Sequence, residues 1–389
     1  MRIIILTGRF GMGHMNAALA IKQQIDNSHM SDHVEVIDWL DYVSPKIAEK
    51  YYRFFNFLVN KGKRFYNTRY RFLENRRTSQ KPELCTYFQK CFKRLMDDKK
   101  PELIISTLPF CSQIISRVKE ETGLYLPLVT CVTDITGHSE WINKNTDFYF
   151  VGSQEVKDKF ISKGVPSNRI FETGLPVRLG FLQDIPDNGI HRKARHILIM
   201  GGGLGMLPKG TDFYKRLNEL PGTVVTVITG KNYALYERLA GRYKNITILG
   251  YVHNVYDYMR RADVIITKPG GITTFEAIHS GVPVLALKPS LQQEVYNARY
   301  IKNRGIGEVI SGDNRQCIEK VIRILDSYRL ENYRSHIKEL KNHLNKYNIT
   351  QILETVVKES IPGRDTGFSQ KIDLVTKEQN ANEAISFNL

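Results

Sequence analysis

The sequence has no apolar run long enough to cross a bilayer. A transmembrane helix needs about 20 consecutive apolar residues, whereas the apolar runs of this 389-residue chain have the length of β-strands. The first run, residues 3–6, ends at a glycine loop, so we expect a first strand there rather than a signal peptide. Any association with a membrane is therefore expected to be peripheral.

Cysteine is scarce, and its positions are scattered. The chain has 5 cysteines and no C-x-x-C pair. This pattern argues against a disulfide framework and against a structural zinc site, and it is typical of the reducing cytosol. We therefore expect a cytoplasmic protein.

Acidic residues are outnumbered by basic ones. The chain has 40 Asp and Glu against 56 Lys and Arg, a net charge of +16. The excess is concentrated in residues 46–81, which hold eleven Lys or Arg, two acids and nine Phe or Tyr. This composition suits an anionic membrane surface, single-stranded nucleic acid, or an ordinary helix with inward aromatics. We favour the membrane surface, with contacts from Lys61, Lys63, Arg64, Phe65, Arg69 and Arg71.

Short apolar runs alternate with helical stretches in both halves of the chain. They lie at 2–6, 34–38, 102–107, 127–133 and 148–153, and again at 196–203, 223–230, 246–252, 263–271 and 282–290. Continuous apolar strands with helices between them indicate a parallel sheet covered on both faces, so the fold class is α/β with two doubly wound domains. We place the domains at 1–182 and 196–360, with a linker at 183–195 and a disordered polar tail at 361–389.

The segment GRFGMGH (8–14) joins the first strand to a helix expected from about Met15 to Ile25. Its glycines, Gly13 among them, bring a ligand close to a helix N-terminus, which favours negative charge. A dinucleotide site would also need an acid after the second strand, where Asp38 fits loosely. His14 does nothing for a pyrophosphate but suits proton transfer. The alternative is a histidine that merely closes the first turn.

A second glycine loop, GGGLGMLPKG (201–210), also follows a strand and precedes a helix. Consecutive glycines let backbone N–H groups approach and cradle a diphosphate. A plain tight turn would show the same residues.

Polar side chains follow the last two strands of the second half. Thr273 and Glu276 form the T-x-x-E pattern of a capping box. They also lie where open α/β sheets bind ligands, so the Glu276 carboxylate is a candidate to hold a ribose. Gln293, Glu294 and Asn297 share one helical face and suit sugar hydroxyls, although a solvated helix start would show them too.

Several of these motifs, in this order and spacing, resemble one family. They are the His14 loop, GGGLGM, KPGGITTFEAIHSGVP (268–283), QEVYN (293–297), VTDITGHSEWI (132–142) and the segment 151–177. Over residues 1–355 the chain resembles the monogalactosyldiacylglycerol synthase and processive diacylglycerol glucosyltransferase family, with peptidoglycan lipid-linked N-acetylglucosaminyltransferases as more distant relatives. The resemblance implies a GT-B fold, in which two Rossmann-like domains face each other across a cleft. It also implies inverting transfer of a hexose, glucose or else galactose, from a UDP-sugar to diacylglycerol or glycosyl-diacylglycerol.

The resemblance further assigns roles to residues. His14 would be the general base, Asp134 would stand near the acceptor or orient the base, and Trp141 would lie on the acceptor and membrane side. The donor would be bound by Gly13, Gly202, Gly203, Gly205, Gly230, Tyr251, Val252, Lys268, Gly270, Gly271, Thr273, Glu276, Gln293, Glu294 and Asn297. The basic aromatic segment would contact anionic lipids on the inner face of the cell membrane.

The sequence also lacks a D-x-D motif. We therefore expect no metal and no cofactor, with the leaving diphosphate neutralised by a helix N-terminus and by Lys268 or Lys209.

Three positions depart from the family pattern and leave the donor sugar open. Leu204 replaces an acid of plant-type members, and Gln292 and Tyr296 replace residues common in bacterial members. Rival functions are a UDP-sugar epimerase, a UDP-N-acetylglucosamine-dependent transferase on a lipid-linked cell-wall precursor, and a nucleic-acid-binding protein. The last would leave both glycine loops and His14 without a role, so we expect no nucleic-acid partner.

Overall fold

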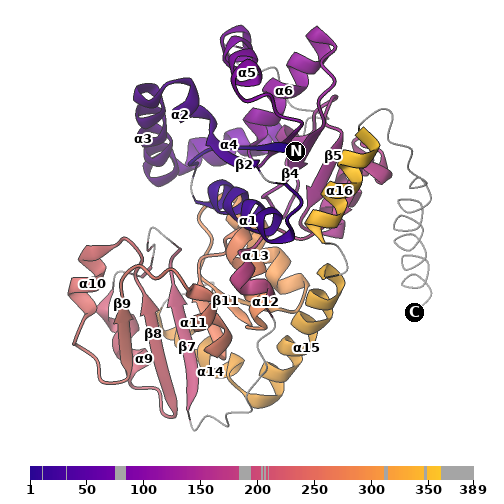
Figure 1. The fold of residues 1–389 in the computed structure, drawn as a ribbon. Coiled ribbons are helices and arrows are strands. Elements are labelled where there is room, and N and C mark those ends of the chain that lie inside the picture. Colours follow the sequence, from indigo (N-terminus) through magenta and orange to yellow (C-terminus); the bar gives the residue numbers. More distant parts are fainter. Residues whose placement is uncertain are drawn as a thin grey trace.

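Two α/β domains make up the computed structural model (Figure 1). The structure describes residues 1–360 except 11, 32, 75–84, 184–193, 203, 204, 206, 209, 311–313, 346 and 347. Most of the predicted linker and the whole predicted tail, 361–389, lie outside the described residues.

The N-terminal domain is built on a six-stranded parallel sheet in the order β2-β1-β3-β4-β5-β6. Its strands are β1 (Arg2–Thr7), β2 (His33–Asp38), β3 (Leu103–Ser106), β4 (Leu128–Cys131), β5 (Phe148–Val151) and β6 (Ile170–Glu172). Its helices are α1 (Gly13–Ser28), α2 (Trp39–Val43), α3 (Pro45–Lys61), α4 (Lys63–Glu74), α5 (Cys85–Lys99), α6 (Pro109–Thr122), α7 (Gln154–Ser162) and α8 (Leu179–Leu182). Two 3₁₀ turns lie at Ser139–Trp141 and Ser167–Arg169.

The second domain repeats the plan, with strand order β12-β11-β10-β7-β8-β9. Its strands are β7 (Arg195–Met200), β8 (Thr223–Ile228), β9 (Ile246–Leu249), β10 (Val264–Thr267), β11 (Val284–Ala286) and β12 (Gly307–Val309). Its helices are α9 (Thr211–Asn218), α10 (Tyr233–Leu239), α11 (Val255–Arg261), α12 (Gly271–Ser280), α13 (Gln292–Asn303), α14 (Asn314–Ile324) and α15 (Ser327–Leu344). All pairings between strands are parallel, as the buried apolar runs predicted.

The last helix, α16 (Ile349–Ser360), returns to the N-terminal domain. Ile349, Leu353 and Val356 are buried in one apolar cluster with Ile3 and Ile5 of β1, and Figure 1 shows α16 beside β5. The core of the N-terminal domain thus includes residues that we placed in the second domain. The sequence pattern of a helix can show that one face is apolar, but it does not indicate which sheet that face covers.

The sequence analysis missed β6 and β12. Each spans three residues, too short for a periodic signal to be distinguished from a loop. Among the described residues, no helix is both long and apolar enough to cross a membrane.

Candidate functional site

His14 lies in the first turn of α1, beside the carboxyl ends of β3 and β4. Its Nδ1 is 2.8 Å from the main-chain oxygen of Thr107 and 2.9 Å from the hydroxyl oxygen of Thr133. A carbonyl oxygen only accepts hydrogen bonds, so Nδ1 carries the ring proton of the neutral imidazole. Nε2, for which no described residue is a hydrogen-bond partner, is therefore left as the proton acceptor.

The pKa of His14 lies below its ordinary value because burial penalises the charged imidazolium. The Asp134 carboxylate and the Thr107 carbonyl oppose this shift without cancelling it. His14 is therefore neutral at neutral pH, as a general base must be. Asp134 acts on the ring through its charge, while the orienting hydrogen bonds come from Thr107 and Thr133.

Trp141 corrects the sequence-based assignment to the membrane side. Its side chain is fully buried, its indole Nε1 donates to Asp134 Oδ2 over 2.9 Å, and its ring centroid is 6.0 Å from that of His14. A buried indole cannot contact lipid. Its hydrogen bond instead fixes the carboxylate that faces the His14 ring.

Asp38 rules out the dinucleotide interpretation of the first glycine loop. Its side chain caps α2 by accepting from the main-chain N–H groups of Leu40 and Asp41, and it also binds the Tyr52 hydroxyl over 2.6 Å and Arg9 Nε over 3.1 Å. The carboxylate is committed to anchoring the loop and α3, so it is not available to a ribose.

The second glycine loop needs glycine for two different reasons. Gly202 and Gly205 have φ values of +69° and +60°, which disfavour side chains. A Cβ at Gly205 would also stand 1.9 Å from the Thr229 carbonyl oxygen, whereas at Gly202 the nearest atom, Lys268 Cε, is 3.9 Å away. Glycine at 205 thus allows the loop to pack closely against Thr229, whereas Gly202 leaves open space over the loop. Gly203 and Lys209 lie outside the described residues.

Helix α12 begins at Gly271, whereas a capping box at Thr273 and Glu276 would require Thr273 to be the N-cap. Its N-cap is Gly270, with no side-chain cap, and Thr273 lies inside the first turn, so the predicted capping box is wrong. The first N–H groups of a helix have no partner within the helix. Because no side chain caps this end either, a ligand oxygen can accept from those groups.

The start of α12 lies against the residues that surround His14. A Cβ at Gly271 would stand 3.1 Å from the Thr133 carbonyl oxygen and 3.0 Å from Leu175 Cδ1. Thr133 therefore contacts His14 through its hydroxyl and approaches α12 through its carbonyl. The structure thus brings the predicted base and the predicted diphosphate site together at the boundary between the domains.

Glu276 is buried one turn further along α12, with an exposed fraction of 6%. Burial raises its pKa to about 7, which the charge of Arg178 only partly offsets. No described residue donates a hydrogen bond to this carboxylate. A buried acceptor without a donor is costly, and two ribose hydroxyls would supply the missing donors.

The polar side chains near the start of α13 differ in whether the protein itself supplies their hydrogen-bond partners. Glu294 Oε2 accepts from the N–H groups of Ser290 and Leu291, Asn297 donates to the Pro269 carbonyl over 2.9 Å, and Lys268 Nζ is 3.9 Å from Glu294 Oε1. Gln293 differs from these residues: it is half-buried, and its Nε2 has no hydrogen-bond partner among the described residues.

The remaining donor-side predictions lie at the ends of β8 and β9. Gly230 has a φ of +60°, and the exposed Tyr251 ring lies 5.9 Å from Lys231 Nζ. Val252 packs on the core of the second domain. Tyr251 thus offers a ring face, whereas Val252 has a packing role.

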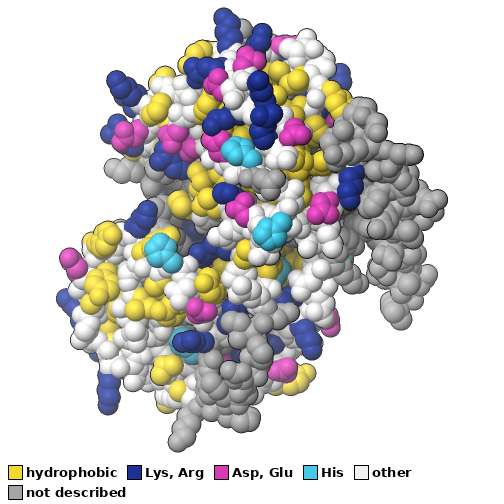
Figure 2. Space-filling view, viewed as in Figure 1, with side chains coloured by type: hydrophobic (Ala, Val, Ile, Leu, Met, Phe, Trp, Pro, Cys, Tyr) yellow, Lys and Arg dark blue, Asp and Glu magenta, His cyan; other side chains and the backbone are white. Residues whose placement is uncertain are grey.

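Helices α3 and α4 bury some aromatic rings, Tyr52 and Tyr70 among them, and expose others, so the interpretation with inward aromatics holds for only part of the segment. Six large apolar residues are each more than half exposed, namely Ile47, Tyr51, Phe54, Phe57, Phe65 and Phe72. Arg64 is exposed beside them and Lys63 is half-buried, while the side chains of Lys61 and Arg69 lie outside the described residues. In Figure 2, basic and hydrophobic side chains lie interspersed over the N-terminal domain. Such a surface suits a membrane interface.

Arg71 has a partner in the second domain, because its Nε donates to Gln292 Oε1 of α13 over 2.8 Å, although its side chain is exposed. Its membrane role stays a prediction. The sequence analysis also missed Thr107, Thr133 and Tyr66. Thr133 lies within the motif at 132–142 and Tyr66 within the basic aromatic segment, but neither was given a role, and only its position after β3 could have pointed to Thr107.

Within the described part of the chain, no three His, Cys, Asp or Glu side chains are close enough to hold a metal ion. Metal independence stays a prediction.

Comparison with known proteins gives two family matches. The model for monogalactosyldiacylglycerol (MGDG) synthase matches residues 14–177, and that for the glycosyltransferase family 28 C-terminal domain matches residues 196–353. The chain is 32% identical over 375 residues to the processive diacylglycerol beta-glucosyltransferase of Bacillus subtilis (strain 168), covering 92% of this chain and 95% of that protein. It is 31% identical over 352 residues to the protein of the same name from Bacillus cereus (strain AH187), covering 87% and 89%.

Solved structures confirm the GT-B fold. The glycotransferase of kitacinnamycin superposes with a TM-score of 0.61 at 12% identity, covering 93% of this chain and 99% of that chain. At this identity the likeness concerns the fold alone.

Proposed function

The chain belongs to the family of monogalactosyldiacylglycerol synthases and processive diacylglycerol glucosyltransferases, and we propose that its donor is UDP-glucose. It is an inverting, UDP-sugar-dependent glycosyltransferase that acts on diacylglycerol. Glucose is favoured over galactose because the curated relatives that match over most of the chain carry glucosyltransferase names.

We propose His14 as the general base. The observation that carries this role is its hydrogen bond to the Thr107 carbonyl, which leaves Nε2 as the free acceptor. Nε2 would take the proton of the diacylglycerol hydroxyl while that oxygen attacks the anomeric carbon and UDP departs on the opposite face. The imidazolium that forms would be stabilised by the Asp134 carboxylate, which already favours the charged ring.

The leaving diphosphate would be stabilised by the second domain. The uncapped N-terminus of α12 offers N–H groups, Gly202 leaves open space over its loop, and Lys268 supplies a positive charge nearby. Such fixed donors and charges act on the negative charge that develops as the sugar bond breaks. Glu276 would accept the ribose hydroxyls.

We propose that the enzyme works as a peripheral protein on the inner face of the cell membrane. The exposed rings of α3 and α4 would enter the headgroup region, and the surrounding Lys and Arg would attract anionic lipids. This surface adjoins the catalytic loop, because Phe10 of that loop packs its ring against Tyr52 and Phe55 of α3.

A panel of UDP-sugars tests the proposal. The protein is incubated with UDP-glucose, UDP-galactose or UDP-N-acetylglucosamine and diacylglycerol in anionic vesicles, and the extracted lipid is analysed by mass spectrometry. We expect a hexose added to diacylglycerol, fastest from UDP-glucose, and the mass gain also reports whether further sugars follow. Preference for the galactose or N-acetylated donor would contradict the donor assignment, and absence of lipid product with all three would contradict the proposed reaction.

A further inference from the structure

Helix α4 belongs to the N-terminal domain, but one of its faces binds the second domain. Asn67 Oδ1 accepts from the main-chain N–H of Gln292 over 2.9 Å, so it caps α13 from the other domain. Arg71 Nε donates to Gln292 Oε1, and the Tyr296 hydroxyl donates to Glu74 Oε2 over 2.7 Å. This face of α4 therefore holds the beginning of α13 in place.

Tyr66 lies on the same face and contacts Gln293 in the first turn of α13. Its hydroxyl is 3.1 Å from Gln293 Oε1. Burial, together with the Asp134, Glu140 and Glu294 carboxylates, raises the pKa of Tyr66, so the hydroxyl keeps its proton and donates it. This bond fixes the orientation of the Gln293 amide, so that its NH₂ group, which has no partner among the described residues, is placed as a donor for a ligand.

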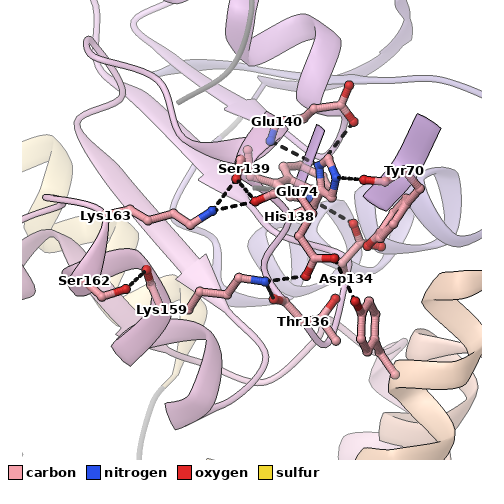
Figure 3. Close-up of polar contacts among 12 residues, drawn as sticks. Tyr70, Glu74, Asp134, Thr136, His138, Ser139, Glu140, Lys159, Ser162 and Lys163 are labelled. Atoms are coloured by element: carbon pink, nitrogen blue, oxygen red, sulfur yellow. Dashed lines mark hydrogen bonds and ion pairs between the residues drawn. The ribbon is translucent and has the colours of Figure 1, made fainter. Parts of the chain in front are cut away.

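The position of Tyr66 is in turn fixed from the catalytic side. His138 Nε2 is 2.9 Å from the Tyr70 carbonyl, and Ser139 Oγ donates to the Glu74 carbonyl over 2.7 Å, so the loop that carries Asp134 anchors the last turn of α4. Figure 3 shows these contacts, together with Lys159 reaching the Glu74 carboxylate over 2.7 Å. The loop at 134–141, α4 and the first turn of α13 thus form one connected polar network.

We propose that Tyr66 is a positioning residue for the donor hexose, acting through the Gln293 amide from the domain opposite the donor. This inference rests on the proposed function, in which Gln293 is one of the expected donor-binding residues and its amide suits the hydroxyl groups of the hexose. UDP alone would not require Tyr66, because the groups proposed to hold its diphosphate and ribose lie on the second glycine loop and α12. Binding of the hexose would require Tyr66. Without the Tyr66 hydrogen bond the Gln293 amide could rotate and present its oxygen where the sugar needs an N–H group.

The test compares the wild-type protein with Tyr66→Phe, Gln293→Ala and the double variant. Tyr66→Phe keeps the ring and removes only the hydroxyl. Tyr328→Phe is the matched control, because that ring is 85% exposed on α15. For each protein, calorimetry gives the affinities for UDP and for UDP-glucose, and kinetics with diacylglycerol vesicles give kcat and KM for UDP-glucose.

We expect Tyr66→Phe to weaken UDP-glucose binding about 3- to 10-fold, the usual worth of one hydrogen bond. UDP binding should change less than about two-fold, and KM should rise more than kcat falls. The double variant should bind UDP-glucose no more weakly than Gln293→Ala, because the hydroxyl acts only through that amide.

Equal losses for UDP and UDP-glucose, or losses that multiply in the double variant, would overturn the role of Tyr66. A wild-type protein that binds UDP-glucose but transfers nothing to lipid would instead contradict the proposed reaction. The affinity comparison would then still decide whether Tyr66 acts on the hexose.

Discussion

The His14 ring donates its Nδ1 hydrogen to the main-chain oxygen of Thr107, 2.8 Å away across 93 residues of sequence. That bond selects the tautomer in which Nε2 is basic. It also ties the first turn of α1 to the end of β3, so the position of the His14 ring is set by the sheet.

Replacing the proposed base should strongly lower turnover and leave donor binding almost unchanged. General-base assistance is worth about 10²- to 10⁴-fold, so His14→Ala should lower kcat by about that factor while calorimetry shows an almost unchanged affinity for UDP. His33→Ala, at an exposed histidine of β2, is the control and should behave like wild type. A His14→Ala protein with full turnover at saturating substrate would show that another group is the base.

The pH dependence of kcat should report the His14 environment. The pKa of His14 lies below its usual value, so the acidic limb of the profile should have its midpoint below pH 6.5 and level off by neutrality. Asp134→Asn removes a charge that favours the imidazolium, so the pKa should fall further, the limb should move to lower pH, and the plateau rate should drop. An acidic limb that moves to higher pH in this variant would contradict the assigned interaction.

Ionisation of Glu276 should lower the free energy of unfolding of the ligand-free protein at alkaline pH. Its pKa is raised from 4.5 to about 7 by folding, so its destabilising effect begins above pH 4.5 and is complete above about pH 7. In chemical denaturation, Glu276→Gln should therefore be more stable than wild type by about 1–3 kcal/mol at pH 8, and equal to it near pH 4.5.

The same Glu276→Gln variant should bind UDP about 10- to 100-fold more weakly, because hydrogen bonds to a charged group are the strong ones. Glu319→Gln, at an exposed acid of α14, is the control for both measurements. Unchanged UDP affinity would remove Glu276 from the ribose site.

Membrane binding should depend on the cations beside the exposed rings of α4. Lys63→Gln combined with Arg64→Gln should weaken binding to anionic vesicles by about 2 kcal/mol, since each charge near the surface contributes about 1 kcal/mol. The measurement is co-sedimentation with vesicles of increasing anionic lipid content. Removing Arg315 and Arg323 from α14 of the second domain changes the net charge equally and should have little effect. Equal losses in both double variants would indicate a nonspecific attraction.

The sequence by itself determined the two parallel sheets and the place of His14, the proposed base, at the start of the first helix. Both are local properties: an apolar run of strand length between helical stretches indicates a buried parallel strand, and His14 follows its glycine turn directly. The GT-B architecture and the family followed from motifs that are contiguous in the chain.

The tertiary structure alone decided which partners those residues meet. Thr107 orients His14, Trp141 is buried against Asp134, α16 packs on the first sheet, and Tyr66 reaches Gln293 across 227 residues. The predicted Thr273 capping box is also wrong, because Gly270 occupies the N-cap position and Thr273 lies inside the first turn of α12. Each of these outcomes depends on how the domains and loops pack, and the periodicity of a segment records only which of its faces is buried, not what buries it.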